Sequence, residues 1–436
     1  MESLTIGIIG IIAFFVLLLI GVHIASALAI VGALGLIAIL GWDKSIEFIS
    51  LTAFFSVFRF ELIALPLFIM AGVVAALGGL SRDIYVALSK WTTRFRAGLG
   101  MATIASCTLF GTVCGSALVT ASVFAKVSSP QLRALGYPKG LAYGVVSAGG
   151  MIGMLIPPSI LIVYYAILTE ESVGKLLIAG ISPGLLLTII FWIGLWVKGR
   201  LNPDLFGAPS MTHPTWRERI ATLPLLWPVT LVAVILVGGI ISGVFDPNEA
   251  GALAVMVILL LTILRIRSIK GLIPSFKEAA AVTGMIFFIF IGGTLFSRFL
   301  TLSGITPVII KWIIGLELSQ LGMVIAMCVV YLIMGCFLDS ISMLSITIPL
   351  IYPVIRTMKI DPIWFGMSVI MAIEIGLITP PFGLNIFAVK GIAERDVSLE
   401  DIFRGVLPFI LMSLGVLILI IAFPTLSTIL PNLMMK

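Results

Sequence analysis

Two apolar stretches of the sequence are interrupted by the same run of residues. Gly153–Pro158 reads GMLIPP and Gly376–Pro381 reads GLITPP, at an offset of 223 residues. Paired prolines remove backbone donors and clash with the preceding helical turn, so we expect a helix to break at each run. Unwound carbonyls in an apolar setting need partners. A desolvated Na⁺ satisfies them, and the following half-helix offers its positive end to an anion.

One such break is also explained by a plain proline kink whose carbonyls are satisfied by Ser or Thr. Two breaks at symmetric positions favour ion and substrate binding instead. Small polar residues at turns of apolar sequence, Thr112–Ala117 and Asp339–Ser342, supply a facing wall for each break. We therefore expect two Na⁺ sites, each between a turn and a break. The first consists of Gly115, Ser116, Gly150, Gly153 and Pro157; the second consists of Asp339, Ser340, Ser342, Gly376, Thr379 and Pro380.

Ionisable residues deep in a membrane are functional candidates, because an unpaired charge there costs a few kcal/mol. Asp339 and Glu374 are the two acids that lie deepest in apolar sequence. Their protonation is an alternative to sodium binding, so proton coupling stays open beside sodium. The Arg298 guanidinium can donate two parallel hydrogen bonds to a substrate carboxylate. Alternatively, its side chain extends to the membrane interface or forms an ion pair with Asp339. The expected substrate contacts are Ser159, Arg298, Glu374 and Asn385.

The composition requires a membrane setting for these residues. Of 436 residues, 60% are hydrophobic and only 11% are charged, which is too little polar surface for a water-soluble globule of this size. Because a spanning helix needs about 20 apolar residues, we expect spans near 4–21, 23–41, 62–80, 176–197, 222–243, 247–264, 280–300 and 405–427. The net charge of +6 arises between spans, so nucleic acid is a poor candidate partner. The cysteines lie in apolar sequence, and we expect no transition-metal site.

Basic residues predict the orientation of the chain. The segments 82–96, 126–139, 198–219, 265–277 and 390–404 hold 18 of the 26 Lys and Arg residues. Placing all five in the cytoplasm makes 97–126 a re-entrant hairpin and 320–354 a hairpin that enters from the opposite face. The fold class is then an all-α polytopic membrane protein with about ten to eleven transmembrane helices plus two re-entrant hairpins.

The two halves of the chain are related beyond the proline runs. At offsets of 224 to 225, Gly111 matches Gly335, Ser116 matches Ser340, Pro138 matches Pro362, Val173 matches Val397, and Gly180 with Pro183 match Gly405 with Pro408. Under the orientation above, the two copies cross the membrane in opposite senses. An inverted repeat with broken helices is typical of secondary transporters.

The sequence also resembles the large membrane subunit of tripartite ATP-independent periplasmic (TRAP) transporters over nearly its whole length. The resemblance rests on Leu65–Gly72, Phe110–Gly111 with Gly115–Ser116, Gly153–Ile160, Ala179–Gly184, Pro247–Ala250 and Thr379–Asn385. One departure is that Ala117–Leu118 follows Ser116, where many relatives have small hydroxyl residues. A hydroxyl ligand of the first ion site is then replaced by backbone.

The resemblance implies an elevator-type transporter of the ion-transporter superfamily in the bacterial inner membrane. It implies a scaffold with an interfacial arm at 1–96, a transport repeat at 97–200, further scaffold with a second arm at 201–316 and a second transport repeat at 317–436. It further implies sodium as the coupling ion and no other cofactor. The implied partners are a small four-helix membrane subunit and a periplasmic binding protein that delivers C4-dicarboxylates, sialic acid or other sugar acids.

Two rival functions make different demands on the residues. A polytopic membrane enzyme needs a cluster of catalytic residues at one depth, and the sequence offers neither His-Glu-x-x-His nor paired aspartates of protease spacing. A channel needs a continuous pore, for which symmetric broken helices facing hairpins are poorly suited. We therefore expect a transporter and not an enzyme.

Overall fold

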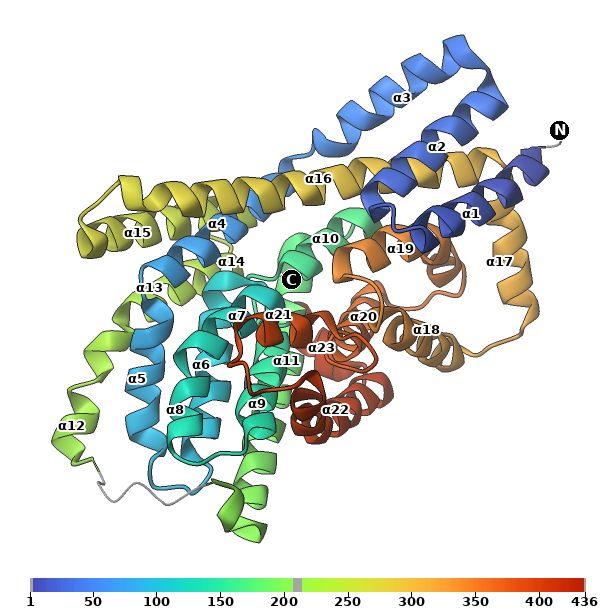
Figure 1. Ribbon diagram of the computed structural model, residues 1–436. Coiled ribbons are helices and arrows are strands. Elements are labelled where there is room, and N and C mark those ends of the chain that lie inside the picture. Colours follow the sequence, from blue (N-terminus) through green and yellow to red (C-terminus); the bar gives the residue numbers. More distant parts are fainter. Residues whose placement is uncertain (1–2, 207–213, 435–436) are drawn as a thin grey trace.

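The computed structural model describes residues 3–206 and 214–434, and within these ranges the regular elements are helices. In chain order (Figure 1) they are α1 (Ser3–Leu19), α2 (Ile24–Leu40), α3 (Trp42–Val57), α4 (Ala64–Leu77), α5 (Leu80–Thr92), α6 (Gly98–Cys114), α7 (Ala117–Val127), α8 (Ser129–Ala134), α9 (Lys139–Ile152), α10 (Ile160–Thr169), α11 (Val173–Leu201), α12 (Trp216–Ile220), α13 (Trp227–Ala233), α14 (Gly239–Ile241), α15 (Pro247–Ile266), α16 (Ile273–Leu302), α17 (Ile305–Gly315), α18 (Gln320–Gly335), α19 (Ser340–Thr357), α20 (Pro362–Gly376), α21 (Leu384–Ile392), α22 (Leu399–Ala422) and α23 (Thr425–Met434).

Hydropathy located the apolar spans well. The expected span at 176–197 is α11, and the one at 247–264 is α15, which begins at the capping residue Asp246. Within the described ranges, 7 helical segments are long and apolar enough to cross a membrane, or up to 8 if the bent pair α17 and α18 counts as one span. Five more apolar helices are shorter, among them α1 and α2. The polytopic helical class is confirmed, whereas ten to eleven crossings stays a prediction.

A helix pair is present at each place where a hairpin was expected, whereas re-entry from opposite faces of the membrane stays a prediction. α6 and α7 are joined at Gly115 and Ser116, and α18 and α19 are joined by residues 336–339. A short helix packs beside each hairpin. α5 contacts α6, and α17 contacts α19. Each hairpin is thus supported from outside by a short neighbouring helix.

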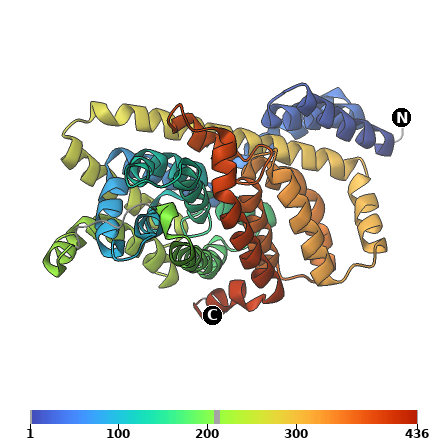
Figure 2. The same cartoon turned by 60° about the horizontal axis from the view of Figure 1, so that its bottom comes forward.

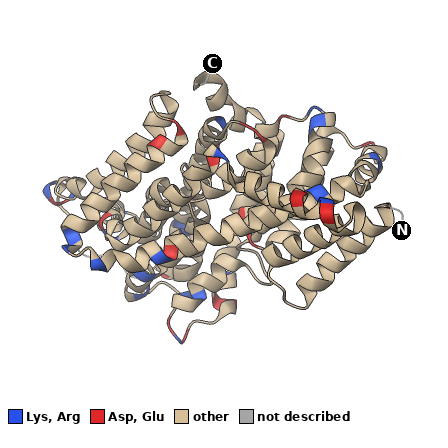
Figure 3. Ribbon diagram, turned by 90° about the horizontal axis from the view of Figure 1, so that it is seen from above, with Lys and Arg blue, Asp and Glu red and all other residues tan. Residues whose placement is uncertain are grey.

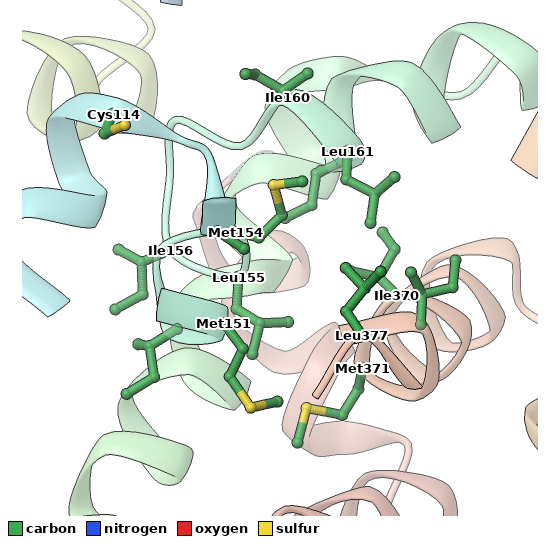
Figure 4. Packing of buried hydrophobic residues seen from close by; sticks show 14 of the residues in the cluster. Cys114, Met151, Met154, Leu155, Ile156, Ile160, Leu161, Ile370, Met371 and Leu377 are labelled. Carbon is green, nitrogen blue, oxygen red and sulfur yellow. The ribbon is translucent and has the colours of Figure 1, made fainter. Parts of the chain in front are cut away.

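Both expected breaks are present as well. The first interrupts the chain between α9 and α10, and the second interrupts it between α20 and α21. The Pro157–Pro158 and Pro380–Pro381 peptide bonds, which lie inside these breaks, are both cis. Figure 4 shows that apolar side chains of the first break, such as Leu155, pack beside those of the second, such as Leu377. The two breaks therefore share one apolar core.

The sequence repeat is also a structural repeat. Gly111 of the first hairpin packs on Gly153, so closely that a Cβ built on Gly111 lies 2.5 Å from the Gly153 Cα atom. The matching Gly335 packs on Gly376, where a built Cβ lies 2.8 Å from the Gly376 Cα atom. Only a residue without a side chain permits this approach of hairpin to broken helix. The same pair of glycines therefore performs the same packing role in both halves.

The remaining helices frame these repeats. α16 is 30 residues long, runs across the top of Figure 1 and packs against α2, α3, α4 and α19. Figure 2 shows the two repeats side by side, and α9 of the first packs against α22 of the second. That contact is also close, because a Cβ built on Gly144 lies 2.5 Å from the Gly405 carbonyl carbon. The frame thus holds the two breaks near one another.

Candidate functional site

The turn of the first hairpin contacts the first break directly. The Gly115 carbonyl oxygen accepts a hydrogen bond from the Ile160 amide at 3.2 Å. Gly115 has φ +61°, and a Cβ there would overlap the Pro158 carbonyl oxygen. Both the left-handed backbone and the lack of space require glycine at this position. The sequence prediction that this turn meets this break is therefore confirmed.

Two serines at this junction cap half-helices. Ser116 Oγ accepts from the Val119 amide at 3.4 Å and begins α7. Ser159 Oγ accepts from the Ile162 amide at 3.2 Å, begins α10, and donates to the Met154 carbonyl oxygen. Ser159 is thus a donor and an acceptor already, whereas Ser116 keeps its hydroxyl hydrogen and one lone pair for another partner.

The first break contains buried backbone carbonyl groups that lack hydrogen-bond donors. The carbonyl oxygens of Ile156, Pro157 and Pro158 accept no hydrogen bond from any residue in the described ranges. Every residue from Met151 to Ile160 is buried. Buried carbonyls ordinarily have a partner, so this cluster suits a cation that ligates oxygen. Gly150 and Gly153 contribute by letting α9 approach α7: a Cβ built on Gly150 lies 2.9 Å from the Ala117 carbonyl oxygen.

At the second hairpin, Asp339 is a helix cap. Its Oδ1 atom accepts from the amides of Ile341 at 3.1 Å and Ser342 at 3.0 Å, and its Oδ2 atom accepts from the Ser342 hydroxyl. The same turn reaches the second break through Phe337, whose ring centroid lies 5.6 Å from that of Phe382. The Asp339 carboxylate therefore caps α19, and only the lone pairs that accept none of these hydrogen bonds are left for an ion.

The second break also has carbonyl oxygens without hydrogen-bond donors, but it is more exposed than the first break. Thr379 Oγ1 donates to the Ile375 carbonyl oxygen at 2.6 Å, and the Thr379 amide donates to the Gly376 carbonyl oxygen at 3.0 Å. The carbonyl oxygens of Ile378, Thr379 and Pro380 accept no hydrogen bond from the described residues. Pro380 is exposed, however, whereas the equivalent Pro157 is buried.

Two of the expected substrate contacts are buried without partners. Glu374 and Asn385 are both 0% exposed. Neither carboxylate oxygen of Glu374 and neither amide atom of the Asn385 side chain forms a hydrogen bond within the described ranges. Ser340 lies next to the Glu374 carboxylate. Buried polar atoms of this kind are costly without a partner, so these two side chains are candidates for contact with a ligand or ion.

Arg298 lies elsewhere. It is exposed on α16 and lines a cavity of about 300 Å³ together with Arg59, Glu170 and Tyr352. Asp339 lines a different cavity of about 550 Å³, with Ser342 and His23. No ion pair joins Arg298 to a carboxylate in the described part of the chain, so the alternative in which it pairs with Asp339 is not what the structure shows. Sequence reasoning missed Arg59 and Tyr352, because nothing in the pattern of spans links them to Arg298.

The two half-sites adjoin. α21, which follows the second break, packs against α7 of the first hairpin and against α9. Tyr164 on α10 and Ser345 on α19 share a hydroxyl–hydroxyl hydrogen bond between the repeats. The half-helix after the second break thus packs directly on the first hairpin and on the helix that leads into the first break.

Comparison with known proteins agrees with this architecture. The family model described as "Tripartite ATP-independent periplasmic transporter, DctM component" matches residues 11–426. The chain is 34% identical over 377 residues to the C4-dicarboxylate TRAP transporter large permease protein DctM of Pseudomonas aeruginosa, covering 86% of this chain and 87% of that protein. It is 30% identical to the isethionate TRAP transporter permease protein DctMQ of Oleidesulfovibrio alaskensis, covering 93% of this chain and 63% of that protein.

Among solved structures, the fold is similar to that of the Alcanivorax borkumensis YdaH transporter. The TM-score is 0.63 at 14% sequence identity, covering 87% of this chain and 89% of that one. At this identity the likeness concerns the fold alone. Together with the family match over most of its length, the paired hairpins and proline breaks establish that the chain belongs to the DctM family and is a large, multi-pass membrane permease component of the TRAP type.

Proposed function

We propose that this chain imports a small organic acid by sodium-coupled secondary transport. The observation that carries the proposal is the pair of equivalent proline breaks, each with carbonyl oxygens that lack hydrogen-bond donors in the described ranges and each reached by a hairpin turn. Sodium takes oxygen ligands and carries one charge, so a ring of backbone carbonyls with one hydroxyl or carboxylate suits it.

The first ion site consists of the carbonyls at Ile156 to Pro158 with the Ser116 hydroxyl. The second consists of the carbonyls at Ile378 to Pro380, with Asp339 or Ser340 from the second hairpin. Both carboxylate oxygens of Asp339 already accept hydrogen bonds at the start of α19. Asp339 would therefore attract the ion mainly by its negative charge rather than by donating several ligand oxygens. Protonation of Glu374, which is buried without a partner, is the competing coupling reaction.

The substrate would lie where the two half-sites adjoin. Asn385 offers two donors and one acceptor from the first turn of α21, whose positive end also favours an anion. Arg298 lines a separate cavity with Arg59, where it would bind a substrate carboxylate on the way to this place rather than at it. Relatives named for C4-dicarboxylates and for isethionate support an anionic substrate.

The assembly and motion belong to the same proposal. A small membrane subunit is supported by the DctMQ relative, of whose length the chain covers only 63%. We further propose a periplasmic binding protein that delivers the acid, an inner-membrane location, and an elevator motion in which the two hairpins and two broken helices move together against α1 to α5 and α12 to α17. The packing of Gly111 on Gly153 and of Gly335 on Gly376 supports movement of each hairpin as one body with its broken helix.

Uptake into proteoliposomes tests the proposal. Vesicles that contain this chain and a co-purified small subunit would receive labelled dicarboxylate, sialic acid or sulfonate together with candidate binding proteins. We expect uptake to require an inward sodium gradient and to proceed without ATP. Uptake that is unchanged when potassium replaces sodium but collapses with a proton ionophore would assign the coupling to protons, and uptake without any gradient would contradict secondary active transport.

A further inference from the structure

A cavity of about 480 Å³ lies where the loop between α5 and α6 meets the end of α11. Three arginines line it: Arg94 and Arg96 from the loop, and Arg200 from the last turn of α11. All three side chains are exposed. A concave site with three guanidinium groups is an anion site by charge and by shape.

No acidic residue lines this cavity, and none of the three arginines forms an ion pair within residues 3–206 and 214–434. Other arginines of the chain do have carboxylate partners, namely Arg59, Arg133, Arg265, Arg356 and Arg404. The nearest acid in sequence, Asp204, is exposed, and the segment 207–213 contains no Asp or Glu. Within residues 3–206 and 214–434, no carboxylate therefore lies within ion-pair distance of these three guanidinium groups.

Aromatic rings hold two of the guanidinium groups in place. The Arg200 guanidinium carbon lies 4.2 Å from the Trp196 ring centroid, and that of Arg94 lies 4.8 Å from the Phe95 ring centroid. Stacking of this kind fixes the plane of a guanidinium and leaves its N–H groups available to a ligand.

The backbone around the cavity is tightly packed. A Cβ built on Gly199 lies 3.1 Å from the Ala97 Cβ atom, so the loop and α11 are in close contact. The Trp192 indole N–H donates to the Met101 carbonyl oxygen at 2.8 Å, about one turn into α6 and about two turns back along α11. The arginines thus project from a preformed framework, and ligand binding need not order the backbone.

The position of the cavity matches the boundary of a bilayer. Between Lys175 near its start and its last turn, α11 carries no charged residue, and Lys198 and Arg200 then follow Trp196. Tryptophan is enriched at headgroup depth, and basic residues gather on the cytoplasmic side. The cavity residues belong to two of the basic segments that the positive-inside rule places in the cytoplasm. In Figure 3 the charged residues lie mainly near helix ends and connecting segments, as expected for this boundary.

We propose that this cavity binds the phosphate headgroup of an anionic phospholipid from the cytoplasmic leaflet. Three guanidinium groups in one cavity match a headgroup with two phosphates better than one with a single phosphate, so diphosphatidylglycerol is the preferred ligand. Because the cavity joins the loop after α5 to the end of α11, the lipid bridges the segment that precedes the first hairpin and the segment that ends the first repeat.

The test compares lipid binding by the purified full-length chain and a triple variant, Arg94→Gln with Arg96→Gln and Arg200→Gln. Native mass spectrometry in detergent, with added diphosphatidylglycerol, phosphatidylglycerol or phosphatidylcholine, gives the affinity of each. We expect wild-type binding in that order, and at least about tenfold weaker diphosphatidylglycerol binding in the triple variant. A triple lysine variant at the same positions should keep most of the affinity.

A matched control removes three charges that do not line the cavity but lie in segments expected in the cytoplasm: Arg217→Gln with Lys270→Gln and Arg395→Gln. Equal loss in the control, or full binding in the triple glutamine variant, would overturn the proposal. Inorganic phosphate that displaces the lipid at equal concentration would also overturn the lipid as ligand. Thermal unfolding in detergent reports whether each variant folds, and if the triple variant does not, Arg200→Gln alone must weaken binding for the proposal to stand.

Discussion

The Ile160 amide donates a hydrogen bond to the Gly115 carbonyl oxygen at 3.2 Å, and this contact ties the tip of the first hairpin to the residue that starts the half-helix after the first break. The hairpin tip and the break therefore form one wall around the free carbonyls of Ile156 to Pro158. A ligand of these carbonyls is coupled to both elements at once.

Loss of the Ser116 hydroxyl should weaken sodium coupling. In Ser116→Ala we expect the sodium concentration for half-maximal uptake to rise roughly five- to tenfold, because one oxygen ligand is lost. The measurement is uptake against external sodium in proteoliposomes. Ser319→Ala is the matched control, since Ser319 also caps a helix, α18, but lies at the far end of its hairpin. Identical sodium dependence in Ser116→Ala and wild type would remove Ser116 from the first site.

The charge of Asp339 can be separated from its capping role. Asparagine also caps helices well, so Asp339→Asn should keep thermal stability within about 0.5 kcal/mol while raising the sodium requirement. Asp361 caps α20 in the same way, with amides of Ile363 at 2.8 Å and Trp364 at 3.0 Å. Asp361→Asn should therefore leave sodium dependence unchanged. If Asp339→Asn transports with wild-type sodium dependence, the Asp339 carboxylate caps α19 but does not take part in sodium binding.

Asn385 should bind substrate at the expense of stability. Replacing it by leucine removes buried polar atoms that lack partners, so we expect Asn385→Leu to unfold at the same or a higher temperature while its apparent KM for the substrate rises about tenfold. Asn248 is the contrasting control: its Nδ2 atom donates to the Phe60 carbonyl oxygen at 2.9 Å. Asn248→Leu should cost about 1–2 kcal/mol of stability, because that carbonyl loses its donor. A lower unfolding temperature with normal KM in Asn385→Leu would assign Asn385 a structural role.

The glycine contacts predict equal sensitivity in the two repeats. Gly111→Ala and Gly335→Ala should each destabilise the protein by about 1–3 kcal/mol, since a methyl group meets backbone of the broken helix. Gly415 on α22 has no atom within 4 Å of a built Cβ, so Gly415→Ala should be neutral or stabilising by up to about 1 kcal/mol. Thermal unfolding in detergent compares the three. Tolerance at one hairpin glycine with damage at the other would show that the two repeats do not pack alike.

The sequence predicted the elements of this fold well, because the signals are local. Proline cannot continue a helix, so Pro157 and Pro380 located the breaks, and the two matched glycine pairs revealed the repeat before any contact was known. Span ends were less well predicted. α11 extends from Val173 to Leu201, beyond the expected 176–197, because Ser172 caps its start and polar residues continue its last turn. Hydropathy alone does not register either effect.

The site was predicted less completely, because contacts between distant residues decide it. Asp339–Ser342 was interpreted as part of an ion site, but Asp339 also caps its helix, as Asp246 caps α15. Arg298 was considered as a partner of Asp339, but the two line different cavities. The cavity of Arg94, Arg96 and Arg200 could not be foreseen, since about a hundred positions of sequence separate its two sides.

The unequal exposure of the two breaks gives the molecule a built-in reference for measurements of accessibility. Pro380 reaches the surface while Pro157, its counterpart in the other repeat, is enclosed. Proline has no amide hydrogen, but amide deuterium exchange at the preceding residues, half-buried Thr379 and buried Ile156, reports both breaks under the same conditions, in the same chain and at the same stoichiometry. The ratio of the two signals is independent of expression level, and a ligand that changes the ratio without unfolding the protein acts differently on the two halves.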